Sequence, residues 1–382
     1  MRAIQNSSPL LRPTLGALLL ALLSTLVLAP AAVAQEAPEA APQETFEEQV
    51  NVTEVVLDAL VTDRKGNVIL GLQPDDFVVE EDGEPVQLDS VSFYSNRLVE
   101  PDDEGAAEAG VSVDDQPSDR YFILFFHDQR INSGSAFRIV ERQLNAGRQS
   151  QDWVREEMLP GDWVAVVSYD VKLKLHQDFT QDRKALLSAI DRAVKGSDGA
   201  NWPSRQDGDE GPALAGNMPS GKELRKATGN IYKGLRVLAE ATEPIQGRKN
   251  LLLFTLGFGE LDSFGNYIPD TRYYPPMMHA LNDANVAVYT IDLSPPNVRH
   301  SLEDAMSHLA ADTGGEYMFT HSNFIKPLRR VSEATNGYYL LSYRSRHPEG
   351  KEGYQKVKVS LKNPKWKVSA RSGYSFGDDS EG

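Results

Sequence analysis

The stretch Arg120-Tyr121-Phe122-Ile123-Leu124-Phe125-Phe126-His127-Asp128 decides the fold. Residues 121–126 form one continuous apolar run, whereas a strand with one face in water would alternate polar and apolar residues. Such a run predicts a buried parallel strand with helices over both of its faces. A helical pattern follows at 136–158, and a second strand pattern at 162–169. The chain from Arg120 therefore predicts the first strand–helix–strand unit of an open sheet.

The same alternation continues along the next part of the chain. Further strands are predicted at 172–179, 250–256, 286–291 and 315–319. Further helices are predicted at 182–194, 223–241, 276–284, 302–311 and 324–335. Repeated units of this kind favour a mostly parallel sheet with helices on both faces. We therefore expect a Rossmann-like α/β domain over residues 120–336.

Two β-rich segments flank this domain, at 50–98 and 337–376. Strands are predicted at 50–62, 68–70, 77–80, 86–94, 338–343, 354–361 and 366–370. Neither segment is large enough to fold alone, and the two ends of a domain often lie close together. We therefore expect both segments to pack into one small β-sandwich, with the α/β domain inserted between them. Residues 99–119 contain no Lys or Arg and predict an acidic linker, and 377–382 form a tail.

The N-terminus has the pattern of a signal peptide over residues 1–34. Arg2 and Arg12 form a basic region, 15–28 are apolar or small, and Ala32-Val33-Ala34 matches a cleavage site. An uncleaved membrane anchor is the alternative, but the apolar run is shorter than the ~20 residues that a spanning helix needs. The pattern predicts a secreted or periplasmic protein without a transmembrane span after cleavage. Residues 35–49 are expected to be a flexible leader.

Composition excludes several classes of chemistry. The chain has 382 residues, a formal charge of −16 and no cysteine. It therefore has no disulfide, no thiol nucleophile and no Cys-ligated metal. A net negative chain repels phosphate backbones, so nucleic acid is not expected as a partner.

An ordered set of short motifs resembles one family. The motifs are Val61-Thr62-Asp63-Arg64-Lys65-Gly66, Gly71-Leu72-Gln73-Pro74-Asp75-Asp76-Phe77, Glu81-Asp82-Gly83, Ala311-Asp312-Thr313-Gly314-Gly315, Tyr338-Tyr339-Leu340-Leu341-Ser342-Tyr343 and Ala370-Arg371-Ser372-Gly373-Tyr374. Together they resemble secreted bacterial proteins with a von Willebrand factor A-related domain, over nearly all of residues 50–376. The resemblance implies a Rossmann-like A domain and a role in binding rather than catalysis.

The resemblance also implies a place for a metal site. A-domains of this type hold Mg²⁺ with Asp-x-Ser-x-Ser after the first strand, a Thr in a later loop, and an Asp after the fourth strand. Here Asp128 matches the first Asp, but Arg130 replaces the first Ser and Asn132 replaces the second. Leu256 stands where the later Asp belongs, and residues 196–219 contain no Thr. The site pattern is therefore degenerate.

A guanidinium beside a divalent cation is repulsive, so no metal cofactor is expected. Any Mg²⁺ or Ca²⁺ would bind at Asp128. One interpretation pairs Arg130 with Asp128 or Asp292 in a metal-independent carboxylate site. The other gives Asp128 a helix-capping or loop role and points Arg130 into solvent. The candidate ligand- or partner-binding residues are Asp128, Arg130, Asn132, Ser133 and Asp292.

We therefore expect a non-enzymatic interaction or adhesion module that binds a protein partner in the envelope or extracellular space. The loops 128–135, 196–219 and 257–275 would hold that partner. The alternative is a metal-dependent hydrolase or adhesion protein with a non-standard site at Asp128. Phe264, Tyr267, Tyr273 and Tyr274 would form either an exposed recognition surface or a loop packed onto its own domain.

Overall fold

A computed structural model describes residues 50–95, 119–129, 136–199, 211–295, 301–348 and 351–377. The predicted signal peptide and leader lie outside these ranges, as do the linker up to residue 118 and the tail from residue 378. Arg130, Asn132 and Ser133 lie outside them too. Within the described ranges, no helix combines the length and apolar character needed to cross a bilayer.

A six-stranded sheet forms the centre of the α/β part, in the order β12-β11-β8-β5-β6-β7. All neighbouring pairs are parallel except β6 with β7. The strands are β5 (Arg120–His127), β6 (Asp162–Tyr169), β7 (Leu173–Thr180), β8 (Lys249–Thr255), β11 (Val286–Asp292) and β12 (Tyr317–Phe319). The predicted first strand is thus a central one, and the mostly parallel sheet is confirmed.

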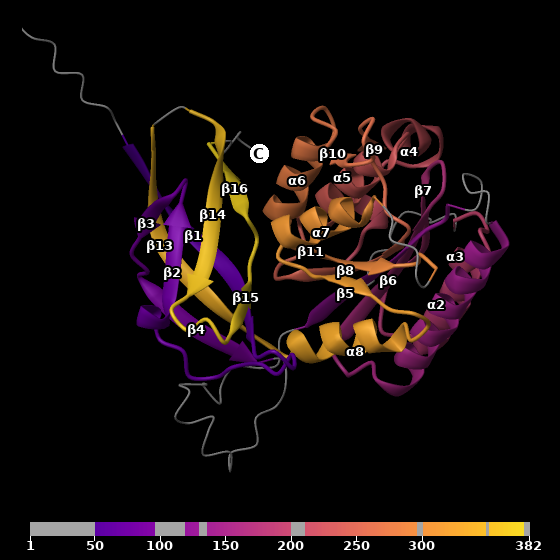
Figure 1. Cartoon of the computed structure of the whole chain (residues 1–382), viewed down its shortest axis with the longest axis horizontal. Helices are drawn as coiled ribbons and strands as arrows, with labels where there is room; N and C mark the ends of the chain where they lie inside the picture. The colour runs from indigo at the N-terminus through magenta and orange to yellow at the C-terminus, as the bar shows by residue number, and fades with distance from the viewer. Residues whose placement is uncertain are drawn as a thin grey trace, which may run out of the picture. The chain divides into compact units, whose positions relative to one another are not determined.

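Helices cover both faces of this sheet because alternate residues of each strand point to opposite sides (Figure 1). One face packs on α5 (Ile231–Thr242), α6 (Tyr274–Asp283) and α7 (Glu303–Asp312). The other face packs on α2 (Ala136–Glu156), α3 (Arg183–Val194) and α8 (Ile325–Ala334). On that second face the Phe122 ring meets the fully buried Trp153 of α2 edge-on, with 5.3 Å between the ring centroids.

The prediction of one helix over 223–241 is wrong. The segment contains α4 (Gly221–Ala227) and α5, separated at Thr228–Asn230. The Thr228 hydroxyl donates to the Leu224 carbonyl at 2.7 Å, and the Asn230 side chain accepts from the Lys233 backbone amide at 2.9 Å. A residue that ends one helix is thus followed closely by one that caps the next.

Two four-stranded sheets form the β-sandwich, in the orders β15-β1-β13-β4 and β16-β14-β2-β3. The strands are β1 (Val50–Thr62), β2 (Phe77–Glu81), β3 (Glu84–Val86), β4 (Ser90–Ser95), β13 (Gly337–Pro348), β14 (Gly353–Leu361), β15 (Lys367–Ser369) and β16 (Gly373–Phe376). Each sheet combines strands from before and after the α/β part, as predicted. The longest pairing, β1 with β13, is antiparallel from Val50↔Pro348 to Ala59↔Tyr339.

Hydrogen bonds join the sandwich to the α/β part along α6 and β16, which lie beside each other in Figure 1. The Asn282 amide donates to the Tyr354 hydroxyl at 2.7 Å, and the Asp283 carboxylate accepts from the Ser375 backbone and hydroxyl. The Tyr354 ring also stacks on His279, with ring centroids 3.8 Å apart. The two parts thus share a polar, aromatic contact.

Candidate functional site

The carboxyl-terminal edge of the parallel sheet brings together the ends of β5, β8 and β11. Thr255 and Asp292 are paired in register as the last residues of β8 and β11, and β5 ends beside them at His127. Parallel strands all present their carboxyl ends at one edge, which is where open α/β sheets bind ligands. The sequence predicted this edge as the site, and the structure places Asp128 and Asp292 there.

A neutral hydrogen-bond network occupies the centre of this edge. His127 Nδ1 lies 2.9 Å from Thr255 Oγ1, and that hydroxyl donates to Gln129 Oε1 at 3.2 Å. Gln129 Oε1 also accepts from the Leu256 backbone amide at 2.8 Å, while its Nε2 donates to the Gly257 carbonyl at 2.8 Å. The side chain of Gln129 thus ties the end of β5 to the turn after β8. Sequence reasoning missed this residue.

His127 keeps this network uncharged. Its side chain is buried, and burial lowers its pKa to about 4, although the nearby Asp128 opposes the shift. The ring also meets Tyr169 and Phe258 edge-on, at centroid distances of 5.7 and 6.4 Å. At neutral pH the imidazole is therefore neutral and shares a hydrogen bond with Thr255.

Asp292 is engaged by its own surroundings. It is 1% exposed; Oδ1 accepts from the Ser294 amide at 2.7 Å and Oδ2 from the Tyr317 hydroxyl at 3.0 Å. Burial, followed by the Asp292 charge, raises the pKa of Tyr317, so this phenol remains a donor. Asp128 is 9% exposed, and its backbone amide donates to the Tyr169 carbonyl at 2.7 Å.

Arg142 of α2 supplies a positive charge near Asp292. Its guanidinium donates to the carbonyls of Leu293 at 2.6 Å, Thr320 at 3.0 Å and His321, and it lies 5.2 Å from the centre of the Phe324 ring. Burial lowers the pKa of Arg142, and the charge of Asp292 opposes this shift. The sequence-based pairing of Asp292 with Arg130 remains a prediction, since Arg130 is outside the described ranges.

Among the described residues, several polar side chains at this edge bond to one another. The Thr255 hydroxyl and the Gln129 amide bond to each other, and Asp292 accepts from a phenol. Across the residues that the structure describes, no three His, Asp or Glu side chains form a metal-binding cluster. The role of Arg130, Asn132 and Ser133 stays a prediction, as does the absence of a metal cofactor.

A short hairpin that sequence analysis did not predict projects after β8. It consists of β9 (Glu260–Leu261) and β10 (Tyr267–Ile268), which pair antiparallel. Asp262 organises the turn, because its Oδ1 accepts from the amides of Phe264 and Asn266 at 2.8 Å each. Gly265 takes the left-handed conformation that this turn needs, with φ of 82°. The signal for the turn was the stretch Asp262-Ser263-Phe264-Gly265-Asn266.

The aromatic residues of the 257–275 loop divide into two groups. Phe264 is 88% exposed at the tip of the hairpin. Tyr274 instead donates from its hydroxyl to Asp312 at 2.7 Å, and the Tyr267 ring packs edge-on against His308. Of the two alternatives for this loop, the exposed surface thus holds for Phe264, and packing onto the domain holds for Tyr267 and Tyr274.

Neither a protein-family model nor a curated protein matches the chain. Several solved structures are similar in fold. The vWF domain of the type V pili tip protein Mfa5 from Porphyromonas gingivalis is 11% identical, with a TM-score of 0.37, covering 57% of this chain and 95% of that one. The von Willebrand factor type A protein from Catenulispora acidiphila is 8% identical, with a TM-score of 0.36, covering 87% and 74%. Both of these structures carry von Willebrand factor in their names.

Proposed function

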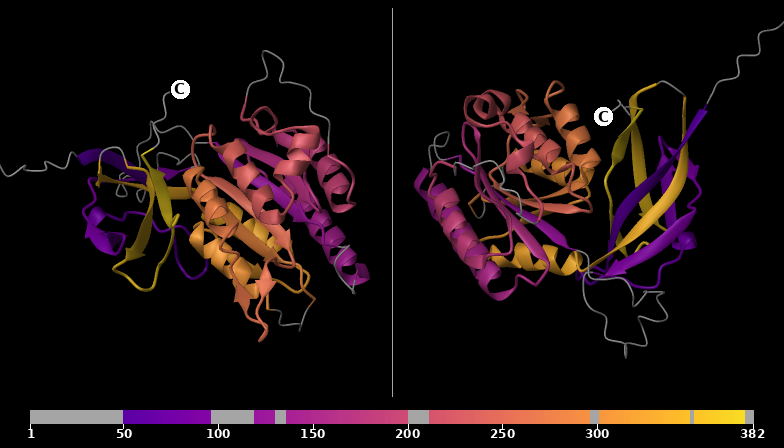
Figure 2. Two further views of the ribbon diagram at one scale, coloured as in Figure 1. Left: turned by 90° about the horizontal axis from the view of Figure 1, so that it is seen from above. Right: turned by 180° about the vertical axis from the view of Figure 1, so that it is seen from behind.

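We propose that the protein is an exported, non-enzymatic module that binds a protein partner of the cell envelope or extracellular space. The binding surface is the carboxyl-terminal edge of the parallel sheet together with the β9–β10 hairpin. The observation that carries the proposal is the exposure of Phe264, with 88% of this residue accessible on a hydrogen-bonded turn. In Figure 2 (left) the hairpin extends beyond the helices of the α/β part.

The hairpin suits binding because it is held in place before a partner arrives. Its turn is fixed by Asp262, and its root is fixed by Tyr267, whose ring contacts His308 and lies against Gly259. An aromatic side chain on an ordered turn loses little conformational entropy on binding. Large aromatic anchors of this kind carry most of the binding energy of many interfaces.

The surroundings of Phe264 define the chemistry of the partner. Leu261 and Ile268 of the same hairpin are 45% and 48% exposed, on its two opposite faces, so each face offers one apolar side chain besides Phe264. Glu260 and Asp262 place negative charge beside this surface. A complementary partner offers an apolar pocket with a basic rim.

The polar groups at the strand ends support binding rather than catalysis. His127, Thr255 and Gln129 bond to each other, and Asp292 is bonded to Tyr317 and Ser294. A metal-dependent hydrolase or adhesion site would need these groups to release each other. We therefore expect the melting temperature to stay the same when MgCl2 is replaced by EDTA. A large shift would instead favour the metal-dependent alternative.

The test starts with a photo-crosslinking amino acid at position 264, used in envelope fractions of the source cell. The crosslinked protein is identified and purified, and its affinity for the wild-type chain and for Phe264→Ala is then measured. We expect Phe264→Ala to weaken binding by about 30-fold, as loss of an aromatic anchor costs ~2 kcal/mol or more. Leu159→Ala is the control, because Leu159 is 37% exposed but precedes β6 at the opposite edge of the sheet. Equal affinity of the two variants would refute the proposal.

A further inference from the structure

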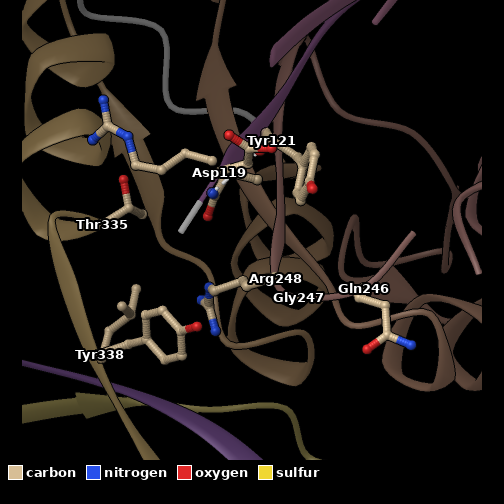
Figure 3. Close-up of a pocket in the computed structure, with 10 residues that line it drawn as sticks. Asp119, Tyr121, Gln246, Gly247, Arg248, Thr335 and Tyr338 are labelled. Carbon is tan, nitrogen blue, oxygen red and sulfur yellow. Dashed lines mark hydrogen bonds between the residues drawn. The ribbon is translucent and has the colours of Figure 1, made fainter. Parts of the chain in front are cut away.

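A cavity of about 300 Å³ lies at the amino-terminal edge of the sheet, away from the proposed partner surface. The α/β part contributes Asp119, Gln246 and Arg248, and the sandwich contributes Leu60 and Tyr338. Figure 3 shows the side chain of Arg248 extending across this cavity towards the Tyr338 ring. By the share of liquid volume that one water takes, ~30 Å³, the space holds on the order of ten non-hydrogen atoms.

Arg248 is a buried cation without a counter-ion in the described part of the chain. It is 8% exposed, and its Nη2 donates to the Gly314 carbonyl at 2.5 Å and to the Tyr289 hydroxyl at 3.4 Å. Both acceptors are uncharged, and Nε has no hydrogen-bond partner. A buried guanidinium that keeps its charge but lacks a partner anion is strongly unfavourable, so this position favours the entry of an anion.

Arg120 lines the same cavity and shows how the chain neutralises a buried arginine. It is 4% exposed, and its Nε and Nη2 donate to the two carboxylate oxygens of Asp162 at 2.7 and 2.8 Å. Its Nη1 donates to the Ser332 carbonyl and the Asn336 side chain. Every part of the Arg120 guanidinium is thus matched, whereas Arg248 meets only neutral oxygens.

The cavity also offers groups that accept hydrogen bonds. Asn250 is 2% exposed, and its Oδ1 has no partner, while its Nδ2 donates to the Tyr121 carbonyl at 3.3 Å. The Asp119 carboxylate is exposed and adds a negative charge. A molecule that complements this lining carries a carboxylate for Arg248 and a donor, best a cationic one, for Asp119 or Asn250.

We propose that this cavity binds a small carboxylic acid with a second, donating group, the chemistry of a free α-amino acid. Its carboxylate pairs with Arg248, its ammonium group faces Asp119, and its carbon skeleton contacts Leu60 and Tyr338. The site is independent of the proposed partner surface. It is built where the chain passes between the sandwich and the α/β part, at Asp119–Tyr121 and at Thr335–Tyr338. A bound molecule would therefore contact both segments that connect the sandwich to the α/β part.

The first test is calorimetric titration of the full chain with L-serine, acetate and ethanolamine at constant ionic strength. We expect L-serine to bind more tightly than acetate, and ethanolamine to give no detectable heat because it lacks the carboxylate. Arg248→Gln should weaken L-serine binding at least ~10-fold, in line with loss of a charged hydrogen-bond donor. Arg236→Gln is the matched control, because Arg236 is 51% exposed and pairs with Glu240 on α5; it should bind like wild type.

Two further variants keep the test valid if Arg248→Gln fails to fold. Gln246→Trp changes an exposed residue of the cavity lining and should reduce binding of every ligand by narrowing the entrance. Asp119→Asn should weaken L-serine but leave acetate unchanged or slightly tighter, because only the ammonium group uses that carboxylate. The proposal is overturned if wild type binds none of the acids at millimolar concentration, or if Arg248→Gln and Gln246→Trp bind L-serine as wild type does.

Discussion

The two edges of one parallel sheet differ in their chemistry. At the carboxyl-terminal edge, His127, Thr255 and Gln129 form a neutral network. At the amino-terminal edge, Arg120, Arg248 and Lys249 are all buried, and the bonds of Arg248 and Lys249 go to uncharged oxygens. The described side chains of the network at the carboxyl-terminal edge thus bond to one another, whereas Arg248 and Lys249 at the opposite edge bond only to uncharged oxygens. The position of an edge in the fold therefore indicates a potential binding site. Whether its polar groups are left to bind a ligand depends on the side chains present.

Lys249 completes this contrast. It is 2% exposed, and its Nζ donates to the Ile245 carbonyl at 2.7 Å. Burial lowers the pKa of Lys249 to about 8; Asp58 opposes the shift, Arg371 adds to it, and Glu243 opposes it more weakly. The amino-terminal edge therefore titrates above neutral pH, while the carboxyl-terminal edge titrates in acid.

The largest effect is expected from breaking the matched pair at the amino-terminal edge. Asp162→Asn leaves Arg120 buried without a counter-ion and should lower the free energy of unfolding by ~3–5 kcal/mol, measured by urea denaturation. Asp152→Asn removes an exposed ion pair with Arg155, in which the two charged groups are 2.8 Å apart. It should lower the free energy of unfolding by less than ~1 kcal/mol. Similar losses in both variants would show that burial does not distinguish these pairs.

The next effect follows from Lys249. Its folded pKa, about 8, lies below its ordinary value of 10.5, so the unfolded chain binds more protons between these pH values. The free energy of unfolding should therefore rise by roughly 3 kcal/mol as the pH increases from 8 to 10.5. Lys249→Met should remove this rise and be more stable than wild type at pH 7. If the free energy of unfolding of wild type and of Lys249→Met changed with pH in the same way, the lowered pKa of Lys249 would be contradicted.

A smaller effect of the same sign, at lower pH, is expected from His127. Its pKa of about 4 lies below the ordinary 6.5. Between these pH values the side chain is protonated in the unfolded chain but neutral in the folded chain. Because of His127, the free energy of unfolding of the wild-type chain should fall by roughly 2 kcal/mol as the pH decreases from 7 to 5. The free energy of unfolding of His127→Gln should fall less over this pH range. It should still fall in part, because His176, whose pKa is also about 4, contributes in the same way. The free energy of unfolding is measured by urea denaturation at both pH values. If wild type and His127→Gln lost the same amount, His127 would not be a cause of the acid sensitivity.

Much of the fold was predictable because its signals are local. The apolar runs of β5 and β8 predicted those strands to within one residue at either end. The break between α4 and α5 was also encoded locally, in Thr228-Gly229-Asn230, but the apolar spacing on both sides concealed it. The hairpin at 260–268 was missed because its strands have two residues each, too few to show a period.

The site was less predictable because its contacts join distant residues. Gln129 acts through groups 126–128 residues further along the chain, so no motif around Gln129 contains them. The uncompensated charge of Arg248 is equally invisible in sequence, since it depends on which carboxylates fold beside it. Asp128 and Asp292, by contrast, were placed at the carboxyl-terminal edge of the sheet by the rule that parallel strands end together, and the structure has them there.

The pairing within the sandwich has a consequence for biosynthesis. The Tyr374 hydroxyl contacts Glu81 across 293 residues, and β1 finds its main partner, β13, only after the whole α/β part has been made. β1 is therefore synthesised long before the strand with which it makes its longest pairing. A chain cut short before residue 337 exposes the edges of β1 and β2, which makes it a substrate for proteases or aggregation.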